Sequence, residues 1–364
     1  MHPIPVLHKL PPARAKVETL AVLRQANKAS SALGELKGIA KTIPNQAMLV
    51  NAVSLQEAKD SSEIENIITT QDELYKALSM TSNIASVVKE VVNYRRAIFQ
   101  GYEIIESQGF LKLKDIETLQ KTIIENDAGV RNMPGTVLRN DKTGEVVYTP
   151  PQEKEEILDL LSNFLEHFNL TQNDLSPLIN LAILHYQFES IHPFYDGNGR
   201  TGRILNILYL IINEQLDIPI LYLSSYINEH KLEYYKLLNE VNKSMEKSSY
   251  ETAWEDWILY MLKAIEVTSY KTIEKISLIT NQLEKTISIA KKKAAKIYRK
   301  ELVELLFEQP YSKIEFVVDR LGVERKAASR YLKRLEAIGI LKSQKIGRET
   351  VYINTALIEV LKKT

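Results

Sequence analysis

The stretch between residues 191 and 203 is Ile191-His192-Pro193-Phe194-Tyr195-Asp196-Gly197-Asn198-Gly199-Arg200-Thr201-Gly202-Arg203. It places a histidine, a carboxylate, an amide, two arginines and three glycines within twelve residues. Apolar residues at helical spacing precede it, at Leu178, Ile179, Leu181, Ala182 and Phe188, and follow it, at Ile204, Leu205, Ile207, Leu208 and Ile211. We therefore expect a polar loop between two buried helices, an arrangement that indicates a functional site rather than packing alone.

The predicted helix boundaries place this loop at a helix N-terminus. Ser176-Pro177 predicts the start of the first helix, and Pro193 is expected to end it. The second helix is expected to begin near Arg200 and to be central, because apolar residues cover most of its circumference. Gly197 and Gly199 allow a tight turn and close approach to a ligand. The loop therefore presents N–H groups at the positive end of a buried helix, which predicts a phosphate site.

Four side chains of the loop complement such a site. Arg200 and Arg203 are three residues apart and can face one anion. Asp196 offers the hard oxygen that Mg²⁺ prefers, and His192 can accept a proton near neutral pH. Taken alone, His192 fits a core histidine better. The combination favours phosphoryl or nucleotidyl transfer over a plain glycine-rich turn, and it is not a Walker A loop because no Lys-Ser/Thr follows the glycines.

The stretch His192-Pro193-Phe194-x-Asp196-Gly197-Asn198-Gly199-Arg200-x-x-Arg203 matches the HPFxDGNGRxxR signature of the Fic (Fic/Doc) family, which this chain therefore resembles. The resemblance implies a mainly α protein with a helical core and a β-hairpin flap. It also implies a nucleotidyltransferase that moves AMP from ATP to Ser, Thr or Tyr hydroxyls of target proteins and of itself, releasing pyrophosphate.

By the same resemblance, His192 is the general base and Asp196 holds Mg²⁺ on the phosphates. Asn198 and the glycine N–H groups form an anion hole, Arg200 and Arg203 bind the β- and γ-phosphates, and Phe194 anchors the loop. The implied ATP-binding set is Glu65, His192, Gly197, Asn198, Gly199, Arg200, Thr201, Gly202, Arg203 and Tyr235.

A second motif lies upstream, at Ser61-x-x-x-Glu65-Asn66. Spacing alone predicts a capping or solvent-facing pair on one helix face. The stretch resembles the (S/T)xxxE(G/N) inhibitory motif of the Fic class whose inhibitory helix is N-terminal. That resemblance implies that Glu65 pairs with Arg203 and blocks the γ-phosphate position, which is reasonable because a carboxylate competes with phosphate for an arginine.

Residues 131–149 hold two short β-like runs around a polar turn and predict a hairpin. An ordinary surface hairpin is the alternative to a functional one. In the Fic family a hairpin at this position is the flap, which binds a target protein by strand addition. We expect the flap.

The C-terminal residues 298–364 predict three helices followed by a two-stranded hairpin, which resembles a winged helix-turn-helix domain. Arg325, Lys326, Ser329, Arg330 and Lys333 would lie on the exposed side of its third helix. Residues 323–334 therefore suit DNA, while protein contact or dimerisation by the same domain is the alternative.

Composition bounds the remaining choices. The chain has 364 residues, a net charge of +1 and no cysteine, which excludes disulfides and thiolate chemistry. No apolar run approaches the ~18 residues of a membrane span, so we expect a cytoplasmic protein without membrane contact. We expect an N-terminal helical region with the inhibitory motif (1–110), a catalytic core (111–260), a helical linker (261–297) and the winged helix (298–364).

Two other functions stay open. The same site could remove AMP from a modified protein, with Glu65 positioning a water. Alternatively, the chain is a DNA-binding regulator whose Fic core only senses nucleotide. Self-association is also left open, since helical Fic proteins with long N-terminal regions often form oligomers.

Overall fold

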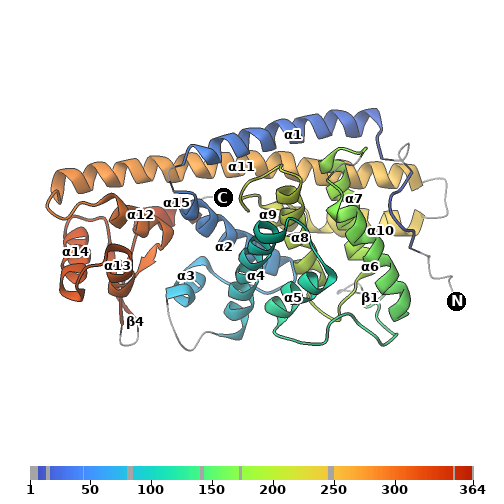
Figure 1. Cartoon of the computed structure of the whole chain (residues 1–364), viewed down its shortest axis with the longest axis horizontal. Helices are drawn as coiled ribbons and strands as arrows, with labels where there is room; N and C mark the ends of the chain where they lie inside the picture. The colour runs from blue at the N-terminus through green and yellow to red at the C-terminus, as the bar shows by residue number, and fades with distance from the viewer. Residues whose placement is uncertain are drawn as a thin grey trace.

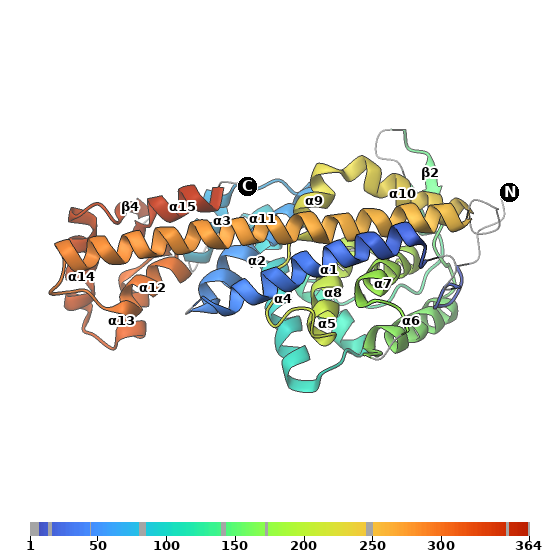
Figure 2. The same cartoon turned by 90° about the horizontal axis from the view of Figure 1, so that it is seen from above.

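The computed structural model describes residues 7–13, 17–43, 45–79, 85–139, 143–171, 174–244, 250–346 and 349–362. It is an elongated, mainly helical molecule in which two long helices lie side by side along one face (Figures 1 and 2). They are α1 (Leu20–Lys41) and α11 (Tyr250–Lys293). The loop of residues 192–197 lies among the helices beneath them, and the C-terminal domain lies at the far end of α11. No helix of the described ranges is both long and apolar enough to span a bilayer.

Helix α1 begins at Leu20. Thr19 caps it by accepting a hydrogen bond from the Val22 N–H at 3.2 Å. Its buried face repeats every three or four residues and packs on α11, through Val22, Ala26, Ala29, Leu33 and Leu36. Helix α11 has 44 residues, hence a length of about 66 Å at 1.5 Å per residue. It crosses the expected boundary at residue 260 without a break.

Helices α7 (Pro177–Ile191) and α8 (Asn198–Ile212) form the centre of the molecule. Ser176 and Pro177 begin α7 as predicted, and nearly every residue of both helices is buried. Helix α8 begins two residues before Arg200 because Gly197, with φ +82°, turns the chain directly into the helix.

The remaining helices surround this pair. They are α2 (Gln46–Ile64), α3 (Gln71–Ser79), α4 (Ser86–Gln108), α5 (Leu113–Ile124), α6 (Lys154–Asn169), α9 (Leu223–Glu229) and α10 (Lys231–Ser244). Helix α4 packs on α8 at Gly101, where a β-carbon would lie only 2.6 Å from Leu208 Cδ1. The absence of a side chain at Gly101 therefore sets how closely these two helices approach.

The predicted hairpin is present but short. Strand β1 (Leu138–Arg139) pairs antiparallel with β2 (Val146–Tyr148), with Leu138 opposite Tyr148 and an irregularity in the register before Arg139. Of the turn predicted at residues 140–144, residues 140–142 lie outside the described residues. The hairpin is anchored at Tyr148, which is buried and donates a hydrogen bond to the Ser190 carbonyl at 3.0 Å.

The C-terminal domain has the predicted order of helices and hairpin, with two additions, the strand β3 and a final helix. Its elements are α12 (Lys300–Glu308), β3 (Tyr311–Ser312), α13 (Ile314–Leu321), α14 (Arg325–Ala337), β4 (Lys342–Ile346), β5 (Glu349–Ile353) and α15 (Thr355–Lys362). The sheet order is β3-β5-β4, all antiparallel. The final helix α15, which the sequence analysis did not anticipate, packs on α11. The winged-helix assignment stays a prediction.

This domain touches the segment that carries the second motif. Helix α12 packs on α2, and Tyr311 stacks on Tyr75 of α3 with ring centroids 5.6 Å apart. Tyr311 also donates a hydrogen bond to Asp72. Helix α2 is therefore held between the central helices and the C-terminal domain.

Candidate active site

The loop between α7 and α8 is tied together by its own residues. Phe194 is fully buried, and the Asn198 amide binds its backbone twice, accepting from the N–H at 2.8 Å and donating to the carbonyl at 2.7 Å. Asn198 was predicted to line an anion hole. Here its side chain shapes the loop, so that the first N–H groups of α8 are the ones left to bind an anion.

His192 stands where α7 ends. Its backbone has φ +49° and ψ +59°, a left-handed conformation that is uncommon for residues other than glycine. Burial, together with the positive charge of Arg131, lowers the pKa of His192 to about 4. The imidazole is therefore neutral near pH 7 and able to accept a proton, as a general base must.

Arg131 was not singled out by the sequence analysis, although it begins the predicted flap. Its Nε donates to the His192 carbonyl at 2.7 Å, and its Nη2 donates to the carbonyls of Pro151 and Ile191. The Tyr195 hydroxyl accepts from the N–H groups of Asn132 at 3.0 Å and Met133 at 3.2 Å. The base of the hairpin is thus fixed directly against the loop between α7 and α8.

Glu65 and Ser61 both contact Arg203, from the far side of the loop. Arg203 Nε donates to Ser61 Oγ at 2.7 Å, and Nη2 donates to Glu65 Oε1 at 2.8 Å and to the Ser61 carbonyl at 3.0 Å. Only 1% of the Arg203 side chain is exposed. Ser61 lies within α2 and Glu65 caps its C-terminus, so the solvent-facing pair that spacing alone predicted is wrong.

The Glu65 carboxylate also lies over the first turn of α8. Glu65 Oε1 is 2.5 Å from where a β-carbon on Gly199 would stand. It therefore lies against the backbone of the first turn of α8, in the space that a side chain at residue 199 would fill. Burial opposes ionisation of Glu65, but the charge of Arg203 and its hydrogen bond outweigh that effect and lower the pKa of the carboxyl.

Arg200 and Asp196 form the outer side of the loop. Arg200 Nη1 lies 3.0 Å from Glu90 Oε2, and its Nη2 lies 3.6 Å from Asp196 Oδ1. The Asp196 side chain is 68% exposed, and its carbonyl accepts from Gln120 Nε2 at 3.0 Å. Within the described residues no group of three or more His, Cys, Asp or Glu side chains could hold a metal. One exposed carboxylate fits Mg²⁺, which commonly takes one or two carboxylates with the oxygens of a bound phosphate.

Two family models cover most of the helical part of the chain. The model described as Fic/DOC family N-terminal matches residues 23–103, and the one described as Fic/DOC family matches residues 110–210. The chain belongs to the Fic/DOC family. A third model, described as the C-terminal domain of SoFic-like protein adenylyltransferase, matches residues 282–357.

Curated relatives of this Fic protein are named as adenylyltransferases. Protein adenylyltransferase Fic of Drosophila mojavensis is 35% identical over 98 residues, which are 26% of this chain and 18% of the relative. A probable protein adenylyltransferase of Aquifex aeolicus is 28% identical over 177 residues, 48% of this chain and 52% of the relative. The matched regions thus span about a fifth to a half of these relatives.

Solved Fic structures share the fold. A Fic family protein from Desulfovibrio desulfuricans superposes with a TM-score of 0.59 over 94% of this chain and 98% of its own, at 18% identity. Fic-1 from C. elegans superposes with a TM-score of 0.52 over 70% and 74%, at 19% identity. The first of these matches extends the similarity over nearly the whole molecule.

Three further predicted site residues differ in their setting. Tyr235 of α10 is 42% exposed and stacks edge-on against Tyr234; Lys231, which begins that helix, donates to Asn66 Oδ1 at 3.2 Å. Gly202 faces Glu189, because a β-carbon there would lie 2.6 Å from Glu189 Oε1. Thr201 is fully buried within α8. An adenosine contact by Tyr235 stays a prediction.

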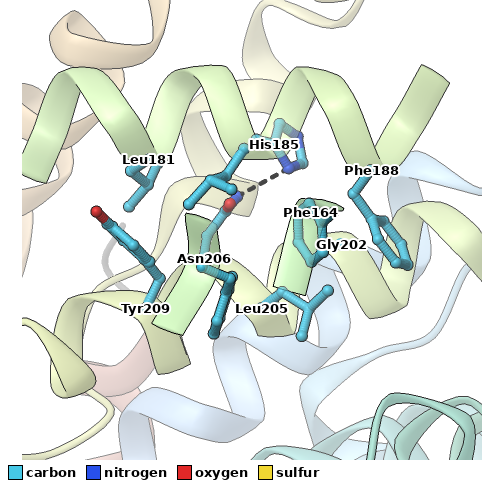
Figure 3. A pocket seen from close by; sticks show the side chains of 10 residues that line it. Phe164, Leu181, His185, Phe188, Gly202, Leu205, Asn206 and Tyr209 are labelled. Carbon is cyan, nitrogen blue, oxygen red and sulfur yellow. Dashed lines mark hydrogen bonds between the residues drawn. The ribbon is translucent and has the colours of Figure 1, made fainter. Parts of the chain in front are cut away.

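The buried polar groups behind the Fic loop belong to the core. Figure 3 shows His185, Asn206 and Tyr209 between α6, α7 and α8, with His185 and Asn206 hydrogen bonded at 3.1 Å. The void that they line is about 10 Å³, room for at most one water molecule. Burial lowers the pKa of His185 to about 3, so it is a neutral packing residue rather than a second base.

Helix α2 is fixed to the Fic core one turn before Ser61. Glu57 is buried and accepts hydrogen bonds from the Tyr94 hydroxyl at 3.0 Å, from the Ser224 N–H at 3.3 Å and from the Ser224 hydroxyl. Burial raises the pKa of Glu57 to about 7. These bonds join α2 to α4 and α9. They therefore fix the position of α2 from which Glu65 reaches Arg203.

Proposed function

We propose that this Fic protein transfers AMP from ATP to a Ser, Thr or Tyr hydroxyl of a protein, including itself, and that Glu65 restrains the transfer. The observation that carries the proposal is the position of the Glu65 carboxylate, held by Arg203 over Gly199 at the N-terminus of α8. A site that binds a carboxylate there is built for an anion, and a triphosphate is the anion that the loop suits best.

The reaction needs a base near the anion site. The target hydroxyl oxygen attacks the α-phosphorus of ATP, the bond from that phosphorus to the bridging oxygen breaks, and pyrophosphate leaves. His192 takes the hydroxyl proton, which its neutral state permits. Charge that gathers on the phosphate oxygens is stabilised by the N–H groups of α8 and by Arg200 and Arg203.

The metal would supply charge. Mg²⁺ held by Asp196 would neutralise the phosphates and assist the departure of pyrophosphate. Asp196 is suited to this because its side chain points largely to solvent while Gln120 and the Gly197 N–H, at 2.6 Å from Asp196 Oδ1, fix the loop around it.

The hairpin would present the target. Arg131 and Tyr195 fix the base of the hairpin beside His192, and β1 and β2 form a short sheet whose edges can pair with an extended peptide. We infer that a target segment adds as a strand there and places its hydroxyl at His192. This pairing recognises the main chain of the target segment more than its side chains.

An ATP-dependent reaction and a cysteine-free chain both fit a cytoplasmic location.

Labelling with two forms of ATP tests the proposal. Label on the α-phosphate should be retained on protein, whereas label on the γ-phosphate should be lost with pyrophosphate. The Glu65→Gly variant should be used, alone and with a cell lysate, because the wild type is restrained. Retention of the γ-label would mean phosphate transfer instead, and absence of both labels would favour removal of AMP by the same site.

Replacing Asp196 with alanine should abolish Mg²⁺-dependent transfer, because the loop then offers no carboxylate to the metal. We expect a loss of at least about 100-fold, the size typical of removing one strong electrostatic contact in a transition state. Transfer is measured in the Glu65→Gly background across a Mg²⁺ titration. Asp127→Ala, which removes a highly exposed carboxylate outside the loop, is the control. A normal rate in Asp196→Ala would remove this residue from the metal site.

A second candidate function is DNA binding by α14. Lys326, Arg330 and Lys333 are exposed on that helix, and Lys342 and Lys345 are exposed on the adjoining strand β4. Such a surface fits a phosphate backbone. Arg330→Ala should weaken DNA binding and make it less steeply dependent on salt, by about one unit of the log–log slope. A titration of duplex DNA at several salt concentrations measures both, and binding that is unchanged by Arg330→Ala would favour protein contact instead.

A further inference from the structure

The second arginine of the anion loop is also held by a carboxylate, and this one comes from α4. Arg200 Nη1 lies 3.0 Å from Glu90 Oε2. Only 4% of the Arg200 side chain is exposed, against 38% of the Glu90 side chain. The arginine is therefore fixed in the protein, while the glutamate reaches it from the edge of the solvent.

The backbone that carries Glu90 cannot move far. Helix α4 lies against α8 at Gly101, where Leu208 leaves no room for a side chain, and it is bonded to α2 through Tyr94 and Glu57. A change of partner at Arg200 must therefore come from rotation of the Glu90 side chain, whose carboxylate can turn into water.

In this structure both loop arginines are already paired with carboxylates. Glu65 neutralises Arg203, while Glu90 and, at 3.6 Å, Asp196 neutralise Arg200. Arg200 Nε is buried, and no hydrogen-bond partner for it is present among the described residues. An incoming polyphosphate thus has to displace side chains from both cations, and it can offer Arg200 more acceptors than Glu90 does.

We propose that Glu90 is a second internal competitor of ATP, which sets the affinity of the site for the triphosphate by pairing with Arg200. The proposal rests on the proposed adenylyltransferase function and adds a control of the same site. The two glutamates would then have different roles. Glu65 blocks a position inside the anion loop, whereas Glu90 only pairs with Arg200 until a phosphate takes the place of the Glu90 carboxylate.

The alternative is that Glu90 orients Arg200 for the phosphate and stays in place when ATP binds. The two roles predict opposite changes. A competitor that is removed leaves a free cation, so ATP binds more tightly. If Glu90 orients Arg200, its removal leaves the Arg200 guanidinium without a fixed orientation, so ATP binds more weakly. The exposure of Glu90 favours competition, because a carboxylate that is 38% exposed can turn into water when a phosphate takes its place on Arg200.

The test is calorimetric binding of ATP with Mg²⁺ to variants in a His192→Ala background, where no transfer consumes the nucleotide. Glu90→Gln should bind ATP roughly two- to fivefold more tightly than its parent, because Arg200 no longer has to exchange an ionic partner for the phosphate. Glu103→Gln, which removes an exposed charge from the same helix away from the loop, should not change the affinity. Thermal unfolding verifies that each variant is folded, and Glu90→Ala is the second variant.

Rates in the Glu65→Gly background give an independent result. Glu90→Gln should lower the KM for ATP with kcat unchanged, as expected when only ground-state pairing is lost. Weaker or unchanged binding in both Glu90 variants would overturn the proposal, and a fall in kcat would assign Glu90 an orienting role. Binding does not require transfer. A protein that fails to transfer AMP would therefore refute the proposed function while leaving this test of Glu90 valid.

Discussion

His192→Ala should lower AMP transfer by about 10²- to 10⁴-fold, the range typical of losing a general base. The expectation follows from the position of His192 at the start of the anion loop and from its neutral imidazole. The change is best made in the Glu65→Gly background, where the unrestrained rate gives room to measure a loss. Initial rates with α-labelled ATP measure it.

His8→Ala is the matched control, since it removes an exposed imidazole far from the loop in sequence. The transfer rates of the two variants should differ by the full loss expected for His192→Ala, with ATP binding retained in both. A rate in His192→Ala within about tenfold of its parent would mean that another group or water accepts the proton.

The low pKa of His192 adds a check on its protonation. A histidine with a folded-state pKa of about 4 stays neutral when the pH is lowered from 8 to 5.5, whereas a histidine with the usual pKa would become mostly charged. The ring signals of His192 in an NMR spectrum, assigned by their absence in His192→Ala, should therefore hardly shift over that range. A midpoint near 6.5 would contradict the effect of burial and Arg131.

The sequence pattern predicted the two central helices and the loop between them, because the residues that determine these elements lie close together in the chain. The apolar spacing of residues 178–191 and 204–212, with Pro193 and Gly197 between them, suffices to place a polar loop at a buried helix N-terminus. The local pattern did not predict that the Asn198 side chain would form hydrogen bonds with the Phe194 backbone, because the path of a tight loop is decided by the packing around it.

Contacts between distant residues needed more than local pattern. Ser61 and Arg203 are 142 positions apart, and spacing alone placed the Ser61 and Glu65 pair at a surface. Only the resemblance to a family motif predicted the contact of Glu65 with Arg203, and nothing in the sequence predicted the hydrogen bonds between Ser61 and Arg203. Arg131 and Glu90 had no such motif. A lone arginine at the base of a hairpin, or a glutamate on an amphipathic helix, looks like any solvated charge until the fold brings it to the loop.

Glu65→Gly should raise AMP transfer by about 10- to 100-fold, because it removes a hydrogen bond between charged groups that phosphate must otherwise displace. Glu65 lies just beyond α2, with φ −89° and ψ +19°, so glycine fits there without strain. Self-labelling and lysate labelling measure the rate. Glu63→Gly is the control, since it loosens the same helix end and leaves the Arg203 contact in place.

Replacements that keep part of the contact should order themselves accordingly. Glu65→Gln retains the shape and a neutral acceptor, so it should activate less than glycine. Ser61→Ala removes the acceptor of Arg203 Nε but keeps the carboxylate, so it should activate least. Equal rates for all three and the wild type would show that the pairing with Arg203 does not restrain transfer.

The activated variant should also become dependent on ATP for stability. Arg203 is 2% exposed, and without Glu65 its charge has lost its closest acidic partner, which is costly for a buried group. The Tm of Glu65→Gly should therefore fall in the absence of nucleotide and recover with ATP and Mg²⁺, since a ligand that binds only the folded state stabilises it. The wild type should gain less from ATP, because Glu65 already occupies the position. A larger gain in the wild type would contradict competition between Glu65 and phosphate for one cation.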